Sequence, residues 1–338
     1  MTAPGRSYRV APPLHTEVAH GVDAVLAEST RLASLTGAVA DAPVTARWPW
    51  LAASVAKPAA GEKPWLVSVA AGSELVAAAL LLDSPGGLRR TTLAGTAENH
   101  RGALLAVDDH AAEQLGVSLA DALSREPREF CLGPISHGPA LAAMLRALPV
   151  ALTIQHVAVP IVRTVGTDST GMSHGVARTL RKARNRLAAD GVVSTVDVTT
   201  DGREITATLP LLESLCRDRD HAGGRLSPLD DPARRRLWHR RVLALAGTGE
   251  LQLATLRLDG ELAAYVLGIE DGPVYRVLEG RYVARWARYA PGRLLEAAAL
   301  DAVIDGPFDT FDWMTSVAPE TLLAANDLDP LVVVSGHS

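Results

Sequence analysis

The sequence predicts an α/β protein of the α+β type, with two tandem units that each combine a mixed sheet with flanking helices. Its second half is patterned as strand, two helices, a three-stranded meander, helix, strand, helix and strand. Asp259-Gly260 and Asp271-Gly272 separate the meander strands, and Asp-Gly between apolar runs is a strong hairpin signal. The first half carries a weaker version of this order, which indicates an internal duplication with domains at residues 1–163 and 164–338.

The first half begins with an expected loose leader, Met1–Pro13, and Pro49 excludes a regular helix interior around Trp48. Asp108 is placed to cap a following helix, because its carboxylate can accept from the free N–H groups of the first turn. The expected helices are Val18–Thr36, Ala111–Leu123 and Pro139–Leu148. The expected strands are Trp65–Ala70, Glu74–Leu82, Leu88–Ala94, Ala103–Val107, Phe130–Leu132 and Ala151–Pro160.

The second half follows a Thr/Ser/Gly-rich link at Thr167–Ser173. Its expected helices are Gly175–Ala189, Ala207–Arg219, Pro232–Ala246, Pro291–Ile304 and a short one near Pro319–Ala325. Its expected strands are Val192–Val198, Leu251–Leu258, Leu262–Ile269, Val274–Glu279, Phe308–Trp313 and Leu331–Val334.

The composition excludes several classes of protein. A net charge of -5 gives no global attraction to nucleic acid or to anionic membranes, so any phosphate site must be local. No apolar run is long enough to span a membrane. Neither Cys131 nor Cys216 has another Cys or a His at the spacing of metal ligands, so we expect no metal site. The two cysteines lie far apart in the sequence, and we expect a reducing, cytoplasmic location. The alanine and arginine bias is typical of a GC-rich bacterial genome.

The most informative segment is the strand Val274–Glu279, followed by a basic stretch and then Tyr289-Ala290-Pro291-Gly292 at the start of a helix. Free N–H groups at such a turn attract an anion, and Gly292 lets a bulky anion approach the backbone. Arg288 and Arg293 flank the turn and can grip phosphate. The alternative is a plain helix start with solvated arginines.

The ordered set of segments resembles the GCN5-related N-acetyltransferase (GNAT) superfamily, in particular its tandem branch of FemAB-like and BioF2-like transferases. Four segments carry the resemblance: the basic helix SHGVARTLRKARNRLAADG, the meander GELQLATLRLDGELAAYVLGIEDGPVYRVLEG, the turn and helix YAPGRLLEAAALDAVIDG, and the strand FDTFDWM. The likeness covers most of Thr164–Val334 and, more faintly, Trp48–Pro160.

The resemblance implies that two strands of the second half diverge and admit the pantetheine arm of an acyl-CoA donor, with acetyl-CoA expected. Its pyrophosphate would meet the helix start; the expected donor-binding residues are Arg281, Arg288, Ala290, Gly292 and Arg293. In the acyl transfer so implied, Glu279 is the expected base and Asp312 is expected to bind the acceptor's ammonium. Tyr282 or Tyr289 would protonate the leaving sulfur. The alternative for either carboxylate is an ordinary solvated or ion-paired group.

On the acceptor side, Arg178 and Arg181 belong to a basic helical stripe that could dock RNA or a phosphorylated substrate, or could be a plain exposed face. His221 lies in a Gly-containing loop that could form a lid, and Trp313 ends the Asp-containing strand as a further substrate contact. His100 is expected in a polar turn of the first half.

Two departures from the family pattern keep alternatives open. Relatives often carry an aromatic-Lys pair after the Asp-containing strand, whereas no lysine follows Asp312 here, and the pyrophosphate turn keeps one glycine only. We therefore expect an N-acyltransferase acting on a small-molecule amine without a membrane partner. The alternatives are an aminoacyltransferase that uses aminoacyl-tRNA and a non-catalytic binding protein; the oligomeric state stays open.

Overall fold

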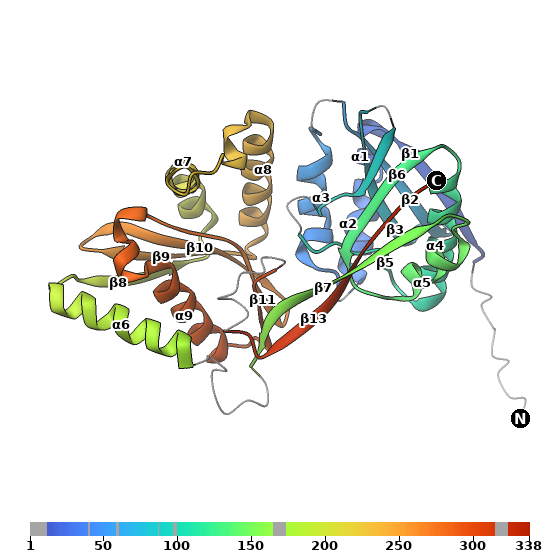
Figure 1. Cartoon of the computed structure of the whole chain (residues 1–338). Coiled ribbons are helices and arrows are strands. Elements are labelled where there is room, and N and C mark those ends of the chain that lie inside the picture. The colour runs from blue at the N-terminus through green and yellow to red at the C-terminus, as the bar shows by residue number, and fades with distance from the viewer. Residues whose placement is uncertain are drawn as a thin grey trace, which may run out of the picture.

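A computed structural model describes residues 12–39, 41–58, 61–86, 88–96, 100–164, 174–314 and 324–338. Its strands form one continuous mixed sheet in the order β1-β2-β3-β4-β6-β13-β7-β12-β11-β10-β9-β8, with β5 paired to β3 (Figure 1). The predicted fold class, two tandem mixed-sheet units with flanking helices, is confirmed.

The first half follows the predicted order with two corrections: Trp48–Val55 forms the helix α3, which was not predicted and which has Pro49 in its first turn, and the start of the chain differs. Val18–His20 belongs to strand β1, which pairs with β2, and helices begin only after Gly21. Asp108 caps α4 as predicted, because its side chain accepts from the Ala111 N–H at 2.8 Å. The strands are β1 Leu14–His20, β2 Lys63–Ala71, β3 Glu74–Ser84, β4 Arg89–Leu93, β5 Leu105–Ala106, β6 Arg128–Ile135 and β7 Leu152–Arg163. The helices are α1 Val22–Ala27, α2 Ser29–Ala38, α3 Trp48–Val55, α4 Asp109–Ser124 and α5 Pro139–Ala147, with the 3₁₀ turn η1 Val44–Ala46.

The second half also matches its predicted order. The strands are β8 Ser194–Thr199, β9 Leu251–Leu258, β10 Glu261–Asp271, β11 Val274–Tyr282, β12 Thr310–Asp312 and β13 Asp327–His337. The helices are α6 His174–Asp190, α7 Gly202–Ala222, α8 Pro232–Thr248 and α9 Pro291–Ile304, with the 3₁₀ turns η3 Pro228–Asp230 and η4 Ala284–Tyr289. The predicted link at Thr167–Ser173 lies outside the described residues, as do most of the leader Met1–Pro13 and of the short helix near Pro319–Ala325.

The last strand joins the two halves. β13 lies between β6 and β7 and pairs antiparallel with both, so the end of the chain completes the sheet of the first half (Figure 1). β7 in turn pairs with β12 of the second half. The predicted boundary at residue 163 stays a prediction, because sheet pairing runs across it without a break.

One apolar core follows a single face of this sheet through both halves. It combines α1, α2 and α3 with α7 and α8, through buried side chains such as Trp50, Leu212 and Val242. In the first half, the opposite face is covered by α4 and α5. In the second half, α6 and α9 cover that face (Figure 1). Helices α3 and α8 pack against each other across the boundary, so the two halves are held at a fixed separation there.

Partly and fully buried ion pairs lock the same junction. Arg47 of the first half binds the carboxylates of Glu250 and Asp271 in the second half. Asp271 also accepts from Arg276 Nε at 2.6 Å, and Arg276 binds Asp312 of the adjacent strand. Both Arg276 and Asp312 are buried, so this chain of charges ties β11, β12 and the first half together beside the candidate site.

Candidate active site

Strand β12 accompanies β11 over only a short stretch, and this is compatible with the divergence that the family resemblance implies. They pair in parallel only from Val274 to Arg276, and β12 ends at Asp312 while β11 continues to Tyr282. Residues 277–282 therefore have no strand partner on the β12 side among the described residues. We call this open side of β11 the donor slot. An unpaired strand edge offers free backbone N–H and C=O groups to a ligand.

A β-bulge lies in the same stretch. The pairing of β10 with β11 shifts between Leu267 and Gly268, whose partners are Glu279 and Val277, so Leu278 is the extra residue. Bulges are common beside active sites because they re-aim neighbouring side chains. Here Leu278 and Glu279 both reach the face of the sheet that α8 covers.

Helix α9 begins next to the slot with an open N-terminus. Ala290 adopts a left-handed conformation (φ 49°), Pro291 occupies the first turn, and the helix has neither an acidic residue in that turn nor a side-chain cap. The Gly292 N–H has no acceptor among the described residues. A Cβ on Gly292 would lie 3.4 Å from the Tyr282 ring, so the glycine leaves the helix start approachable. Such a terminus favours a bound anion.

The corresponding turn of the first half is blocked. Helix α4 starts with Asp108 as its cap and Asp109 in its first turn, so carboxylates already occupy the helix N-terminus. The gap beside β4 is also closed, because Gly102 bridges to Ile135 of β6. The corresponding helix start is therefore uncapped in the second half and capped by its own carboxylates in the first.

The arginines predicted to bind the donor are placed differently from one another. Arg288 is exposed and contacts the Tyr289 hydroxyl and Asp190, whereas Arg293 pairs with Glu296 at 2.6 Å on α9. Arg281 is half-buried in β11; burial lowers its pKa, but the neighbouring groups Glu279, Cys216, Tyr265 and Asp220 together outweigh burial and raise the pKa above its usual value. Their role as donor ligands stays a prediction.

Tyr282 and Tyr289, the predicted proton donors, both lie near the α9 turn. The Tyr282 hydroxyl accepts from Arg219 at 2.7 Å, and that guanidinium lies 4.4 Å from the ring centre. Tyr289 is 1% exposed and donates to Asp190 at 2.8 Å. Because the Tyr289 hydroxyl is engaged by α6, Tyr282 is the better placed of the two beside the slot.

Glu279 is held by two donors. Trp238 Nε1 donates to one carboxylate oxygen at 3.1 Å, and the Tyr265 hydroxyl donates to the other. Burial, reinforced by the Glu279 charge, raises the pKa of Tyr265 well above its usual value, so the phenol keeps its proton and remains a donor. The carboxylate is thereby fixed in orientation on β11.

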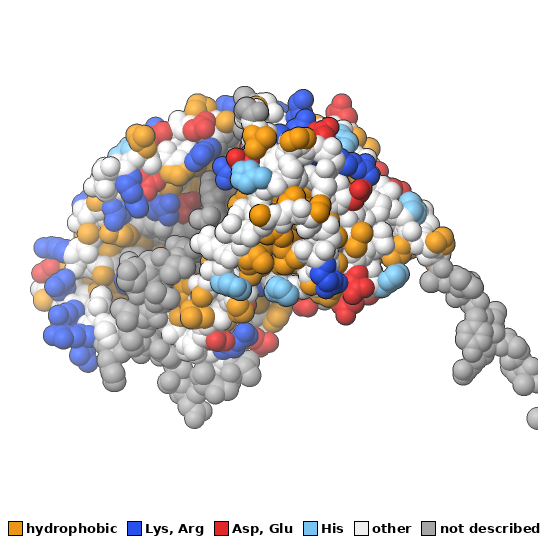
Figure 2. All heavy atoms as spheres, turned by 45° about the vertical axis from the view of Figure 1, so that its right-hand side comes forward, with side chains coloured by type: hydrophobic (Ala, Val, Ile, Leu, Met, Phe, Trp, Pro, Cys, Tyr) orange, Lys and Arg blue, Asp and Glu red, His pale blue; other side chains and the backbone are white. Residues whose placement is uncertain are grey.

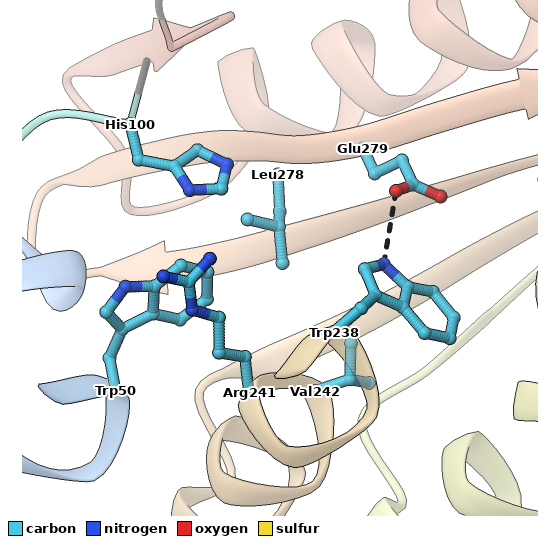
Figure 3. A pocket seen from close by; sticks show the side chains of 7 residues that line it. All are labelled: Trp50, His100, Trp238, Arg241, Val242, Leu278 and Glu279. Carbon is cyan, nitrogen blue, oxygen red and sulfur yellow. Dashed lines mark hydrogen bonds between the residues drawn. The ribbon is translucent and has the colours of Figure 1, made fainter. Parts of the chain in front are cut away.

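Glu279 lines a cavity between the two halves, which we call the interface cavity (Figure 3). Its other lining residues are Trp50, His100, Trp238, Arg241, Val242 and Leu278. Trp50 and His100 belong to the first half, and their rings meet edge to face at 5.2 Å. Arg241 stacks 4.5 Å from the Trp50 ring centre and donates to Ser54 Oγ at 3.3 Å. The first half thus builds one wall of a cavity that contains the predicted base.

His100 is the buried polar group of that wall. We predicted this histidine in a polar turn, but the prediction is wrong about its surroundings. His100 is only 8% exposed, because the two halves close around it. Burial, together with the positive charge of Arg241, lowers the pKa of His100 to about 3, so the imidazole is neutral. Its Nδ1 has no hydrogen-bond partner among the described residues.

Asp312 and Trp313 lie apart from the interface cavity. Asp312 is 2% exposed, binds Arg276 and accepts from the Met314 N–H at 2.6 Å. Burial raises the pKa of this carboxyl, although Arg276 opposes the effect. Trp313 is buried against Phe311, with ring centres 4.8 Å apart. The contacts of both residues are structural and lie where β12 ends. Their predicted substrate contacts stay predictions.

His221 and the basic stripe of α6 are the remaining predicted residues. His221 Nε2 lies 2.7 Å from Asp230 and holds η3 against the end of α7, and this contact lowers the pKa of Asp230 to about 2. Arg178 and Arg181 are exposed on α6, and neither forms an ion pair within the described part of the chain. Figure 2 shows Lys and Arg side chains gathered at the second-half end of the molecule (left).

Comparisons with known proteins agree with this geometry. Residues 175–320 match the acetyltransferase (GNAT) domain family. The solved structure of FemX is similar over 91% of this chain and 95% of its own, with a TM-score of 0.59 at 10% identity. The C-terminal domain of a putative lysylphosphatidylglycerol synthetase from Agrobacterium fabrum is similar over 76% and 80%, with a TM-score of 0.51 at 12% identity. A Bacteroides thetaiotaomicron protein of unknown function covers 92% and 97%, with a TM-score of 0.54 at 12% identity.

The search of curated proteins finds no match. Residues 175–320 therefore match a GNAT domain, and the whole chain has a fold similar to that of FemX, in agreement with the predicted resemblance to tandem, FemAB-like members of this superfamily. Within the described ranges no helix is long and apolar enough to cross a membrane. The same residues contain no group of three or more His, Cys, Asp or Glu side chains that could hold a metal ion.

Proposed function

We propose that this protein transfers an acyl group, with acetyl as the first candidate, from a coenzyme A thioester to the amine of a small molecule. The observation that carries the proposal is the donor slot beside the open start of α9. A long, narrow donor with a diphosphate in its middle fits an unpaired strand edge that ends at an uncapped helix N-terminus. The matching acetyltransferase family supports the same choice of donor.

In the proposed reaction the thioester carbonyl lies along the open edge of β11, where backbone N–H groups can stabilise the oxyanion. The amine enters from the interface cavity and attacks the carbonyl carbon; the new N–C bond forms and the C–S bond breaks. Glu279 accepts the amine proton, directly or through one water. Tyr282 gives its proton to the leaving thiolate, and the Arg219 guanidinium on its hydroxyl stabilises the phenolate that results.

The reaction fits a cytoplasmic protein. Cys131 and Cys216 are free cysteines, which suits a reducing compartment. We infer a small-molecule acceptor because Glu279 lines the small interface cavity.

The test is an assay of acyl transfer from acetyl-CoA to a panel of amines, in which the release of free CoA is measured. Glu279→Gln should lower turnover at least tenfold with the thermal unfolding midpoint preserved. The matched control is Glu270→Gln, which changes a carboxylate of the neighbouring strand that binds Gln252 at 3.2 Å and lies outside the interface cavity. Unchanged turnover in Glu279→Gln removes this residue from the mechanism.

A second candidate donor is aminoacyl-tRNA, and one observation favours it. Four cations of α6 are exposed and form no ion pair among the described residues: Arg178, Arg181, Lys182 and Arg184. Such a stripe could follow a phosphate backbone. Salt-sensitive binding of charged tRNA that Arg181→Glu weakens would favour this donor over acetyl-CoA. If neither donor binds, a non-catalytic binding protein is left.

A further inference from the structure

The interface cavity has the size of a small water site. Its volume is about 30 Å³. A water needs roughly 10–15 Å³ on this scale, so the cavity has room for about two to three waters. A whole acceptor molecule does not fit in that space. Its amine end can take the place of one water beside Glu279, and about one or two waters then stay in the cavity.

Glu279 accepts hydrogen bonds at one end of the cavity. Its carboxylate oxygens accept one hydrogen bond each, from Trp238 Nε1 and from the Tyr265 hydroxyl. A carboxylate has about four acceptor positions, so both oxygens can accept again. Because Glu279 lines the cavity, a water there can donate to it (Figure 3). The two protein donors fix the orientation of the carboxylate and therefore the place of that water.

His100 can hold a water at the other end. Its side chain is 8% exposed, and its Nδ1 has no partner among the described residues. A buried ring nitrogen without a partner is unfavourable, and a water in the cavity supplies the missing hydrogen bond. Burial and the positive charge of Arg241 hold the pKa of His100 at about 3, so the ring is neutral. A neutral imidazole can accept from water at Nδ1, and it does not compete with Glu279 for a proton.

Leu278 separates Glu279 from His100, so a link between the two has to pass through water (Figure 3). Leu278 is the extra residue of the β-bulge, and it lines the cavity together with both polar side chains. The waters for which the cavity has room can form a short chain past this side chain. Such a chain connects a group of the first half with the predicted base of the second half.

The other polar groups of the cavity wall already have partners. The Trp50 N–H donates to the Gly95 carbonyl at 3.3 Å. Arg241 stacks on Trp50 and donates to Ser54 Oγ. The remaining wall is aliphatic and indole surface. The water chain is therefore directed toward the carboxylate and the imidazole.

We propose that His100 holds the water through which Glu279 takes the proton of the attacking amine. This inference rests on the acyl transfer proposed above and gives the first half of the chain a part in that reaction. As the N–C bond forms and the C–S bond breaks, the amine gives a proton to the water, and the same water gives a proton to Glu279. The water is unchanged in sum. His100 is a positioning residue, because its own protonation does not change.

The experiment replaces the imidazole and follows kcat and KM separately in the acetyl-CoA assay. His100→Phe should lower kcat roughly tenfold or more and leave the KM for acetyl-CoA within about twofold, because it removes the anchor of the water and not the donor slot. His100→Asn keeps an acceptor oxygen on a short side chain and should recover most of kcat. The matched control His137→Phe, at an exposed histidine of the first half, should behave as the wild type.

A measurement on the wild-type protein tests the water itself. Transfer through a water moves two protons in the step that forms the N–C bond, whereas direct transfer moves one. In mixtures of H₂O and D₂O, kcat should therefore fall along a curve as the D₂O fraction rises. Direct transfer gives a straight line.

Three results overturn the inference and leave the proposed acyl transfer standing. They are an unchanged kcat in His100→Phe, an equal loss of kcat in His100→Phe and His100→Asn, and a straight or flat dependence on D₂O. No transfer to any amine by the wild type overturns the proposed function and this inference together. An acetyl-CoA-induced rise in unfolding temperature shows that a variant is folded. If His100→Phe lacks this rise, His100→Asn and the D₂O series decide.

Discussion

Arg276→Met should destabilise this protein far more than Asp312→Asn, although the two side chains form one buried ion pair. The cluster at the junction of the halves contains two guanidiniums, Arg47 and Arg276, and three carboxylates, those of Glu250, Asp271 and Asp312. Removing the Asp312 charge leaves two charges of each sign. Removing Arg276 leaves one guanidinium facing three carboxylates.

The expected magnitudes follow from burial. Arg276 is 7% exposed and Asp312 is 2% exposed, so each charge depends on its partners and not on water. Loss of one partner from such a pair costs about 3–5 kcal/mol, which we expect for Arg276→Met. Asp312→Asn keeps an oxygen that can accept from Arg276 and should cost about 1–2 kcal/mol. Methionine retains most of the apolar stem, so lost packing is a minor part.

The loss in Arg276→Met should also depend on pH. Burial raises the pKa of Asp312 and Arg276 opposes this, so removal of the guanidinium raises the pKa further. A carboxyl whose pKa is higher in the folded state binds more protons there, so it destabilises the protein increasingly as pH rises above the unfolded value of about 4. The deficit should therefore be smaller at pH 5 than at pH 7.5.

Urea unfolding followed by tryptophan fluorescence, at both pH values, measures these differences. The double variant Arg276→Met/Asp312→Asn completes a mutant cycle and should recover part of the loss, because it removes the carboxylate left without a cation. Equal costs for the two single variants would refute this account of the cluster, and so would a deficit for Arg276→Met that is the same at both pH values.

Two further predictions concern single side chains. Tyr265→Phe removes one of the two donors to Glu279 and should lower kcat/KM roughly tenfold. The control Tyr275→Phe loses an equally buried hydroxyl, which binds Gln252 at 2.9 Å, and should leave kcat/KM unchanged. Equal losses in the two variants would contradict the positioning role of Tyr265. Burial raises the pKa of Cys216 to about 12, so at pH 8 a thiol reagent should modify it only after unfolding; rapid reaction in the native protein, mapped by mass spectrometry, would contradict the burial of this thiol.

Much of the second half could be predicted because its signals are local. Asp259 and Gly260 both adopt positive φ in the turn between β9 and β10, which is the conformation that Asp-Gly favours in tight hairpins. Pro291 and Gly292 likewise mark the start of α9, and the helix spans the predicted residues. These residues fix the backbone within a few positions of themselves.

Features that depend on distant pairing could not be predicted. β13 extends over Asp327–His337 because β6 and β7 flank it, and those strands lie more than 160 residues earlier in the sequence. Val18–His20 is apolar enough for a helix and becomes a strand because β2 pairs with it. In both places a tertiary partner decides the structure, and no nearby turn signal announces it.

The same reason explains which site residues were missed. Glu279 was predicted from its place at the end of a strand, but Trp50 and His100 reach it only because α3 and α8 pack across the two halves. Trp48-Pro49-Trp50 stands out in the sequence as an unusual aromatic pair, and this was the available signal for a functional wall. His100 has no such signal, because nothing around it indicates burial.

The central claim is that β11 and α9 form a donor site, and calorimetric titration with acetyl-CoA tests it most directly. The wild-type protein should bind one equivalent. Gly292→Val should weaken binding at least tenfold, because its side chain fills the space between the helix start and Tyr282. Gly247→Val, at an exposed and uncrowded position of α8, should bind as the wild type does. Absence of binding by the wild type, or equal affinity in Gly292→Val, would contradict a donor site at this turn.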